Sequence, residues 1–312
     1  MKFDVIIGNP PYQENDNRGD RKQLSHNLYS KISILSFNLI KDKGIISFIV
    51  PISWMSSSSE KGSKKIKDKF KLLFKKYNVL YLNINNMKGF DKIGSLFSYF
   101  VIKKENFNFN KTNVNCNYKN NIYKSNIIMG NREWFPILLS NTTISILDKT
   151  CWANNEKFDI QNSNFYHPIV VNGRKDRKLS NTKSDECVYK LYHTNAKFKY
   201  GNIPHENQFR KKILFSKSGY IKPFYDKGLY GTTDAAFWIY VASKKEALNI
   251  INILTSKLYT FILTVSKWSG FNMPEVVYSL PYLNSNKFWT NSDIYKYFNL
   301  TQEEINYIED NT

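Results

Sequence analysis

The sequence predicts an α/β fold, with a partial doubly wound, Rossmann-like sheet over its first third and an α+β part after it. Two observations carry this prediction. Between residues 3 and 104, short apolar runs typical of buried strands alternate with segments of helical apolar spacing. After residue 150, short aromatic strands punctuated by glycine precede a long helical segment. Strands that alternate with helices favour a mostly parallel sheet covered on both faces.

The first part contains the most regular pattern. Strands are predicted over residues 3–7, 45–50, 79–84 and 96–103, and helices over residues 24–41 and 63–77. The second strand follows Gly44 and ends at Pro51, both of which interrupt regular structure. The second helix begins at Ser63, a favourable N-cap, and carries an apolar stripe opposite a lysine-rich face. We interpret that face as a solvated surface.

The remainder of the chain is less regular. Residues 105–128 are rich in asparagine and weakly patterned, so a linker is predicted there. The predicted divisions are residues 1–105, a linker and helix over 106–150, a second domain over 151–285, and a helical tail over 286–312. A long helix is expected over about 244–265. A short acidic helix opens with the capping-box pair Thr301 and Glu304.

Composition limits the classes of function. The chain has 312 residues, 45 Lys and Arg against 26 Asp and Glu, and a net charge of +19, which favours a nucleic-acid partner. Hydrophobic residues at 42% exclude a wholly disordered chain. No apolar run is long enough for a membrane span or a secretory signal, so we expect a cytoplasmic protein, or one of the nucleus or a viral factory. The three cysteines lie far apart, which predicts reduced thiols and no metal site.

The sharpest motif is Asn9-Pro10-Pro11-Tyr12, which directly follows the first predicted strand. Ligands of open α/β sheets lie at the carboxyl ends of the strands, so this loop is expected in the active crevice. Two prolines restrict its backbone. The carboxamide oxygen of Asn9 and the carbonyl of Pro10 can both accept from one NH2 group, which frees its delocalised lone pair for attack. Tyr12 offers a flat face on which a planar base can stack.

The segment FDVIIGNPPY resembles motif IV of the S-adenosylmethionine-dependent amino methyltransferases, above all the N6-adenine DNA methyltransferases of restriction–modification systems. The resemblance implies S-adenosylmethionine as the cofactor and a flipped adenine as the substrate. It also implies that Asn9 and Pro10 hold the adenine amino group, that Pro11 belongs to the same catalytic loop, and that Tyr12 stacks on the base.

Two further segments resemble this family in the same order. Residues 44–51 resemble the strand of motif VI, and residues 93–100 resemble the motif VII–VIII region, where an aromatic residue covers the other face of the target base. Phe97 and Tyr99 project to one face of the predicted strand, and Phe100 projects to the other. Phe97 and Tyr99 are therefore candidates for base stacking, with core packing as the alternative.

The second half resembles the target-recognition domains that follow the catalytic domain in these enzymes. The similar segments are residues 209–216, 231–233, 256–258 and 267–272. This resemblance implies double-stranded DNA as a partner, held by loops that clamp phosphates or read base edges. The candidate DNA-binding residues are Arg174, Lys175, Arg177, Lys178, Arg210, Lys211, Lys212, Trp268 and Phe271. A solvated charge cluster is the alternative for the basic residues.

The Gly-rich turn that holds the methyl donor in this family is not found. No two of the thirteen glycines are separated by a single residue, so the cofactor-binding residues are unassigned. We expect another polypeptide or an N-terminal segment to complete the donor site, and the first strand to have an unpaired apolar edge. A split enzyme, a truncated reading frame and a degenerate DNA-binding protein all fit, with a donor-binding subunit or a nuclease as possible partners.

These observations predict a site-specific DNA adenine-N6 methyltransferase, or the subunit that carries its catalytic loop and recognition domain. A non-catalytic DNA-binding subunit of such a complex is the first alternative. A glutamine-amide protein methyltransferase is the second, because an amide NH2 poses the same problem of nucleophilicity. Donor binding with and without candidate partners would separate these hypotheses.

Overall fold

The structure is a computed structural model that divides the chain into two compact units, Met1–Ser145 and Ile146–Thr312. It describes residues 2–12, 28–55, 61–86, 96–108, 111–130, 132, 134–173, 176–195, 197–219, 221–268, 270 and 272–312. Each unit is considered by itself below.

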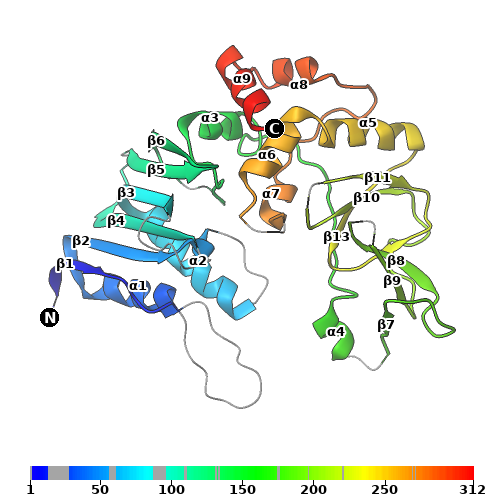
Figure 1. The fold of residues 1–312 in the computed structure, drawn as a ribbon, viewed down its shortest axis with the longest axis horizontal. Helices are drawn as coiled ribbons and strands as arrows, with labels where there is room; N and C mark the ends of the chain where they lie inside the picture. The colour runs from blue at the N-terminus through cyan, green and yellow to red at the C-terminus, as the bar shows by residue number, and fades with distance from the viewer. Residues whose placement is uncertain are drawn as a thin grey trace. The chain divides into compact units, whose positions relative to one another are not determined.

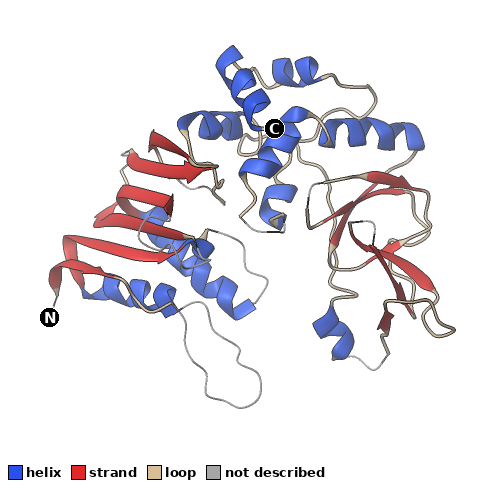
Figure 2. Ribbon diagram, in the orientation of Figure 1, coloured by secondary structure: helices blue, strands red, loops and turns tan. Residues whose placement is uncertain are grey.

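The N-terminal unit consists of a single sheet with helices packed against it (Figures 1 and 2). Its elements are β1 (Phe3–Gly8), α1 (Leu28–Leu39), β2 (Ile40–Pro51), a 3₁₀ turn η1 (Ile52–Trp54), α2 (Lys61–Lys76), β3 (Tyr77–Asn86), β4 (Phe97–Asn106), β5 (Thr112–Tyr118), β6 (Asn121–Ile127) and α3 (Asn141–Lys149), the last crossing into the second unit. The four predicted strands and two predicted helices are therefore present, with most boundaries shifted by a few residues.

The strands form a six-stranded mixed sheet in the order β1-β2-β4-β3-β5-β6. β1 is parallel to β2, and β3 is parallel to β5, whereas β4 runs antiparallel to both of its neighbours. The carboxyl ends of β1, β2 and β3 therefore lie at one edge of the sheet, where β4 begins. The predicted α/β class is confirmed, although the sheet is mixed instead of mostly parallel.

Among the described residues, the helices of this unit cover one face of the sheet. Aromatic side chains of η1, α2 and β4 form the core there, with the Trp54 and Phe74 rings stacked at 4.2 Å and Phe70 edge-on to Trp54 at 5.4 Å. Tyr29 of α1 joins this cluster through Phe70. On the opposite face, Tyr99 of β4 is only half-buried. The expectation of helices on both faces is not met in the described part of the chain.

The asparagine-rich segment, predicted to be a linker, instead forms strands. β5 and β6 make a hairpin that extends the sheet beside β3. Along β5, Val114 and Cys116 are buried on the helix-covered side, whereas Asn113, Asn115 and Asn117 alternate with them on the other side. This is the period-two pattern of a strand with one polar face, which the high asparagine content concealed.

β1 is an edge strand whose outer side has no partner strand among the described residues. Two of its apolar side chains are largely exposed, Val5 at 56% and Ile7 at 75%. Exposed apolar side chains on an unpaired strand are the expected sign of a surface that another element covers. The side of β1 away from β2 is therefore open in the described part of the chain, and Val5 and Ile7 project from the sheet face opposite α1 and α2.

The C-terminal unit combines two small sheets with a group of helices. Its elements are α4 (Pro168–Asn172), β7 (Leu179–Ser180), β8 (Tyr189–Thr194), β9 (Lys197–Gly201), β10 (Lys212–Ser216), β11 (Phe224–Asp226), β12 (Gly231–Thr232), β13 (Ala236–Tyr240), α5 (Lys244–Leu254), α6 (Lys257–Val265), α7 (Pro274–Tyr278), α8 (Asn291–Tyr297) and α9 (Gln302–Asn311). One sheet has the order β11-β10-β13 and the other the order β12-β8-β9-β7. Leu214 and Trp238 of the first sheet pack with Tyr192 of the second.

The long helix expected near residues 244–265 is divided into α5 and α6. Thr255 caps the end of α5, and Ser256 takes the extended conformation of an N-cap before α6. No single helix in the described part of the chain is long and apolar enough to cross a membrane. Taken together, α5 and α6 pass this test by length and composition, but they are bent by 56°.

Candidate active site

The loop Asn9-Pro10-Pro11-Tyr12 begins where β1 ends, at the edge formed by the carboxyl ends of β1 and β2. Pro10 is buried, whereas Asn9 and Pro11 are exposed and Tyr12 is half-buried. The buried proline anchors the loop, and its fixed φ limits the directions that the neighbouring residues can take. The loop therefore lies, as predicted, at the carboxyl edge of the sheet, which is where ligands of open α/β sheets bind.

The side chains of Asn9 and Tyr12 contact each other within the loop. The Tyr12 hydroxyl donates a hydrogen bond to Oδ1 of Asn9. Burial raises the pKa of Tyr12, which keeps the phenol protonated as the donor. A carboxamide oxygen has two lone pairs, so Asn9 Oδ1 retains an acceptor position for an incoming N–H group. The pair can thus hold an amine beside an aromatic ring.

Phe97 and Tyr99, the two candidates for base stacking, occupy different surroundings. The rings of Tyr12 and Phe97 lie 5.4 Å apart at an angle of 46°. Phe97 is only 2% exposed, so its ring packs against Tyr12 and has little free surface on which a base could stack. Tyr99 lies two residues further along β4, where its hydroxyl accepts a hydrogen bond of 3.0 Å from Asn83. The structure therefore brings Phe97, but not Tyr99, into contact with the loop.

The described residues do not contain a fitting site for S-adenosylmethionine. No turn with the Gly-rich character of a donor site follows any strand in the described ranges. The outer edge of β1 is instead open and apolar. The described part of the chain therefore leaves the methyl-donor site unassigned.

Two of the candidate DNA-binding residues lie near α4 and β7. The Arg177 guanidinium stacks on the Phe165 ring at 3.6 Å and donates to the Phe165 carbonyl oxygen at 3.0 Å. Lys178 is exposed and pairs with Glu186 at 2.7 Å. Both cations already have partners, and Arg177 is half-buried. Their neighbours in the predicted cluster, Arg174 and Lys175, lie outside the described residues.

Three further candidates remain at the surface of this unit. The Arg210 guanidinium stacks on the Tyr240 ring at 3.5 Å, and Lys211 is exposed with its amine 3.3 Å from the Ala242 carbonyl oxygen. Trp268 is half-buried. Phe271 lies outside the described residues. Arg210 and Lys211 keep the exposure that a contact with a phosphate or base requires.

The prediction that Lys212 contacts DNA is wrong. Its side chain is fully buried and forms an ion pair of 2.7 Å with the equally buried Asp226. Burial lowers the pKa of Lys212, whereas the Asp226 carboxylate opposes that shift. The same carboxylate accepts hydrogen bonds from the backbone of Leu229 and Tyr230. Lys212 therefore stabilises the sheet and is not available to a phosphate.

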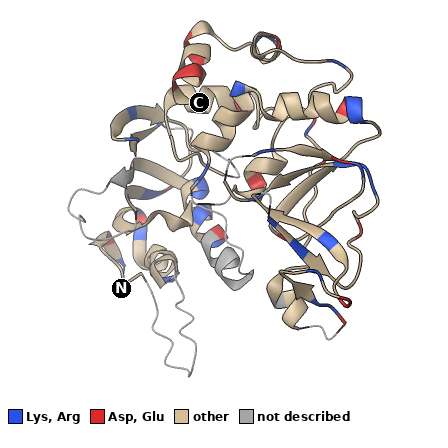
Figure 3. Cartoon of the chain, turned by 45° about the vertical axis from the view of Figure 1, so that its right-hand side comes forward, with Lys and Arg blue, Asp and Glu red and all other residues tan. Residues whose placement is uncertain are grey.

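A second basic group, on β8 and β9, was not among the predicted residues. The Lys190 amine lies 4.2 Å from the Phe198 ring and 5.3 Å from the Tyr230 ring. Lys197 and Lys199 flank Phe198 on β9, so their side chains project to the opposite face of that sheet. We call these five residues the β8–β9 cluster, and Figure 3 shows basic positions along the strands of this unit. Lysines beside aromatic rings suit a phosphate backbone with stacked bases, and the Lys-Phe-Lys run was the signal available in the sequence.

Comparison with known proteins finds sequence similarity to methylases. Residues 1–90 match the family described as Eco57I restriction-modification methylase. An uncharacterized adenine-specific methylase of Mycoplasma pneumoniae is 30% identical over 158 residues, which cover 49% of this chain and 36% of the relative. The chain thus spans about a third of that relative's length.

Solved structures show weaker likeness. The type IIL restriction-modification enzyme MmeI in complex with DNA has a TM-score of 0.43 at 7% identity, over 90% of this chain and 45% of that one. A modification subunit of a putative type I restriction enzyme from Vibrio vulnificus YJ016 has a TM-score of 0.28 at 14% identity, over 39% of this chain and 27% of that one. Likeness at this level carries no argument about function.

Proposed function

We propose that this chain is the base-handling and DNA-binding part of an adenine-N6 DNA methyltransferase of the restriction–modification type. One observation carries the proposal. A loop with Asn9 and Tyr12 in mutual contact follows β1 at the carboxyl edge of the sheet, inside the segment similar to restriction–modification methylases. This loop offers the acceptors and the aromatic ring that an exocyclic amine on a flat base requires.

The proposed chemistry follows from how an aryl amine reacts. The nitrogen of adenine N6 is a poor nucleophile because its lone pair is delocalised into the ring. Asn9 Oδ1 and the Pro10 carbonyl oxygen accept one hydrogen bond each from the amine, which favours a tetrahedral nitrogen with a localised lone pair. Tyr12 stacks on the extruded base, and Phe97 holds the Tyr12 ring in place. S-adenosylmethionine would supply the methyl group.

The donor site belongs, in this proposal, to strands that pair with the open edge of β1. The exposed Val5 and Ile7 side chains would become buried when such strands are present. They can come from a separate polypeptide or from a segment that continues the same sheet. The active form is then this chain together with its donor-binding part.

The decisive experiment replaces Asn9 in an active complex that contains the donor-binding part. Asn9→Ala removes one of two acceptors that matter most in the transition state, so kcat should fall about 10² to 10³-fold. Duplex affinity should stay nearly constant because it depends on phosphate contacts elsewhere. Asn121→Ala, at an exposed asparagine that opens β6, is the matched control. Unchanged methylation by Asn9→Ala would reject the proposal.

A second candidate function is a DNA-binding subunit without catalysis. The β8–β9 cluster favours it, because those lysines and aromatic rings suit nucleic acid whether or not the loop is active. In that case Lys190→Ala would weaken DNA binding, and no Asn9 variant would change the methylation rate of the complex. Asn9→Ala therefore separates the two functions, because Lys190→Ala should weaken DNA binding under either of them.

A further inference from the structure

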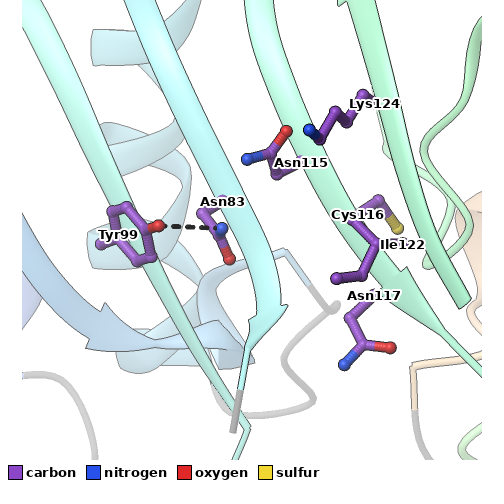
Figure 4. A pocket seen from close by; sticks show the side chains of 7 residues that line it. All are labelled: Asn83, Tyr99, Asn115, Cys116, Asn117, Ile122 and Lys124. Carbon is purple, nitrogen blue, oxygen red and sulfur yellow. Dashed lines mark hydrogen bonds between the residues drawn. The ribbon is translucent and has the colours of Figure 1, made fainter. Parts of the chain in front are cut away.

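A pocket of about 220 Å³ lies on the face of the N-terminal sheet opposite α1 and α2. Its lining residues come from four adjacent strands, β3 to β6, and are Asn83, Tyr99, Asn115, Cys116, Asn117, Ile122 and Lys124 (Figure 4). The wall is unusual for its three carboxamides and its lysine. The asparagine-rich hairpin that resembles a linker in sequence supplies most of it.

A hydrogen-bond network fixes the side of this pocket nearest β4. The Tyr81 and Tyr99 hydroxyls lie 3.3 Å apart. Asn83 donates to Tyr99 at 3.0 Å, and Asn115 donates to Tyr81 at 2.6 Å. Both amides are thus held by their nitrogen atoms, which leaves their Oδ1 atoms as acceptors. Side chains held on strands in this way are preorganised to recognise a ligand.

The opposite side of the pocket is formed by Asn117, Ile122 and Lys124. In the described part of the chain, Asn117 and Lys124 make no side-chain hydrogen bond or ion pair. Lys124 lies directly across from Asn115 in the β5–β6 register, and the two side chains point toward each other in Figure 4. Ile122, across from Asn117, is 63% exposed. The pocket therefore combines free donors and acceptors with an apolar wall.

The pocket opens on the same face of the sheet as the candidate active site. Phe97, which contacts Tyr12, and Tyr99, which lines the pocket, are two residues apart on β4 and point to one face. Two residues of a strand span about 7 Å. The pocket thus begins roughly one nucleotide spacing from the residue that supports Tyr12.

We propose that this pocket binds a nucleobase next to the target base on the same DNA strand. The inference rests on the proposed function and deepens it, because it assigns a base-reading subsite to the methyltransferase unit itself. Carboxamides and lysine recognise the edges of adenine and guanine through paired donors and acceptors. A phosphate is the poorer match, since the pocket has one cation and three carboxamides. Ile122 supplies the apolar contact that a planar base requires.

The test is an NMR titration of the full chain with dAMP, dGMP, dCMP and TMP, with deoxyribose 5-phosphate as the base-free probe. The side-chain amide signals of Asn115 and Asn117 should shift in a saturable way with at least one nucleotide, and far less with the base-free probe. Equal shifts with deoxyribose 5-phosphate, or no shift with any nucleotide, would overturn the inference.

Matched variants separate the pocket from its surroundings. Asn117→Ala and Lys124→Ala should each weaken nucleotide binding about fivefold to tenfold, as expected for the loss of one hydrogen bond. Asn113→Ala, also on β5, and Lys111→Ala, just before it, should leave binding unchanged. Equal losses in all four variants would contradict a specific pocket.

The Asn9→Ala variant distinguishes failure of this inference from failure of the proposed function. It should bind nucleotides at the pocket as the unchanged chain does, because Asn9 does not line the pocket. If methylation depends on Asn9 but the pocket amides never respond, only the subsite is rejected. If the amides respond normally but methylation does not depend on Asn9, only the proposed catalytic role is rejected.

Discussion

Two adjacent lysines of the C-terminal unit have opposite surroundings. Lys211 is exposed, whereas Lys212 begins β10, the central strand of its sheet, on which every residue is buried. Lys212 lies directly across from Asp226 of β11. Because a buried charge requires a partner, the pair Lys212 and Asp226 acts as a unit, and neither can be removed alone without cost.

This arrangement predicts that Lys212, but not Lys211, contributes to the stability of the fold. Lys212→Ala leaves the Asp226 carboxylate buried without its cation, so the free energy of unfolding in urea should fall by about 3–5 kcal/mol. The double variant Lys212→Met with Asp226→Asn should recover much of this loss. Lys211→Ala should leave the unfolding free energy within about 0.5 kcal/mol of the unchanged chain. A Lys212→Ala chain as stable as the parent would contradict the prediction.

His205 provides a pH-dependent contribution to stability. It packs between Phe165 and Trp238 and is 2% exposed, and burial lowers its pKa to about 4 from an ordinary value near 6.5. The unfolded chain therefore binds a proton that the folded chain does not, between about pH 6.5 and pH 4. The free energy of unfolding should decrease as the pH falls through this window, by up to about 3 kcal/mol.

The measurement is urea unfolding of the parent and of His205→Gln at pH 7.5, 6.0, 5.0 and 4.0. The variant should be less stable at pH 7.5 because its packing is imperfect, but its stability should depend less on pH. The difference between the two chains should therefore shrink toward pH 4. Parallel pH profiles would show that His205 does not titrate in this window.

At the scale of residues, the sequence predicted the position of the loop Asn9-Pro10-Pro11-Tyr12 better than the surroundings of Lys212. The loop Asn9-Pro10-Pro11-Tyr12 is local, so four consecutive residues and a preceding strand suffice to place it. The burial of Lys212 depends on its ion pair with Asp226. Asp226 is distant in the sequence and becomes adjacent to Lys212 only when the sheet has formed. The Tyr12–Phe97 contact is non-local for the same reason.

Among the elements, the cap of the last helix could be predicted from the sequence, whereas the break between α5 and α6 could not. The capping box of Thr301 and Glu304 forms as expected, because both partners lie within one helical turn. The division of α5 from α6 at Thr255 and Ser256 depends partly on Asn291, whose side chain accepts from the backbone of Lys257. The apolar stripe continues through this break, so periodicity alone predicted a single helix.

The open edge of β1 leads to a prediction about association. Ile7 is 75% exposed, so Ile7→Lys should not reduce the stability of the isolated chain. It should weaken pairing with another strand, whether from a second copy or from a donor-binding part, because burying an isoleucine contributes about 1.5–3 kcal/mol. The dissociation constant measured by sedimentation should therefore rise roughly tenfold or more.

Leu72 supplies the control for this experiment. It is 55% exposed on α2, a helix that packs on the covered face of the sheet. Leu72→Lys makes the same chemical change away from the edge and should leave association unchanged. Equal weakening by both substitutions would indicate general loss of apolar surface instead of strand pairing at β1.

For the whole molecule, the sequence predicted the class of the fold. It did not predict that, among the described residues, helices cover only one face of the N-terminal sheet. Alternating strands and helices indicate a layered α/β unit, because each helix must cover apolar strand residues. Whether a helix lies above or below the sheet depends on the order of the strands in that sheet. β4 follows β3 in the sequence but lies between β2 and β3 in the sheet, which the sequence pattern does not reveal. This order leaves one face to polar side chains, including those of the pocket.

The net charge of +19 gives a prediction for the complete chain. If the chain binds duplex DNA through several phosphates, its affinity should fall by about 10³-fold or more between 50 and 200 mM salt, since bound phosphates release counterions. Lys199→Ala, in the β8–β9 cluster, should lower affinity for all sequences and reduce the slope of log K against log salt by about one unit. Lys296→Ala, exposed on α8 near the acidic tail, should leave the slope unchanged. Affinity that does not depend on salt would instead favour the glutamine-amide methyltransferase hypothesis, because a protein substrate releases no such counterions.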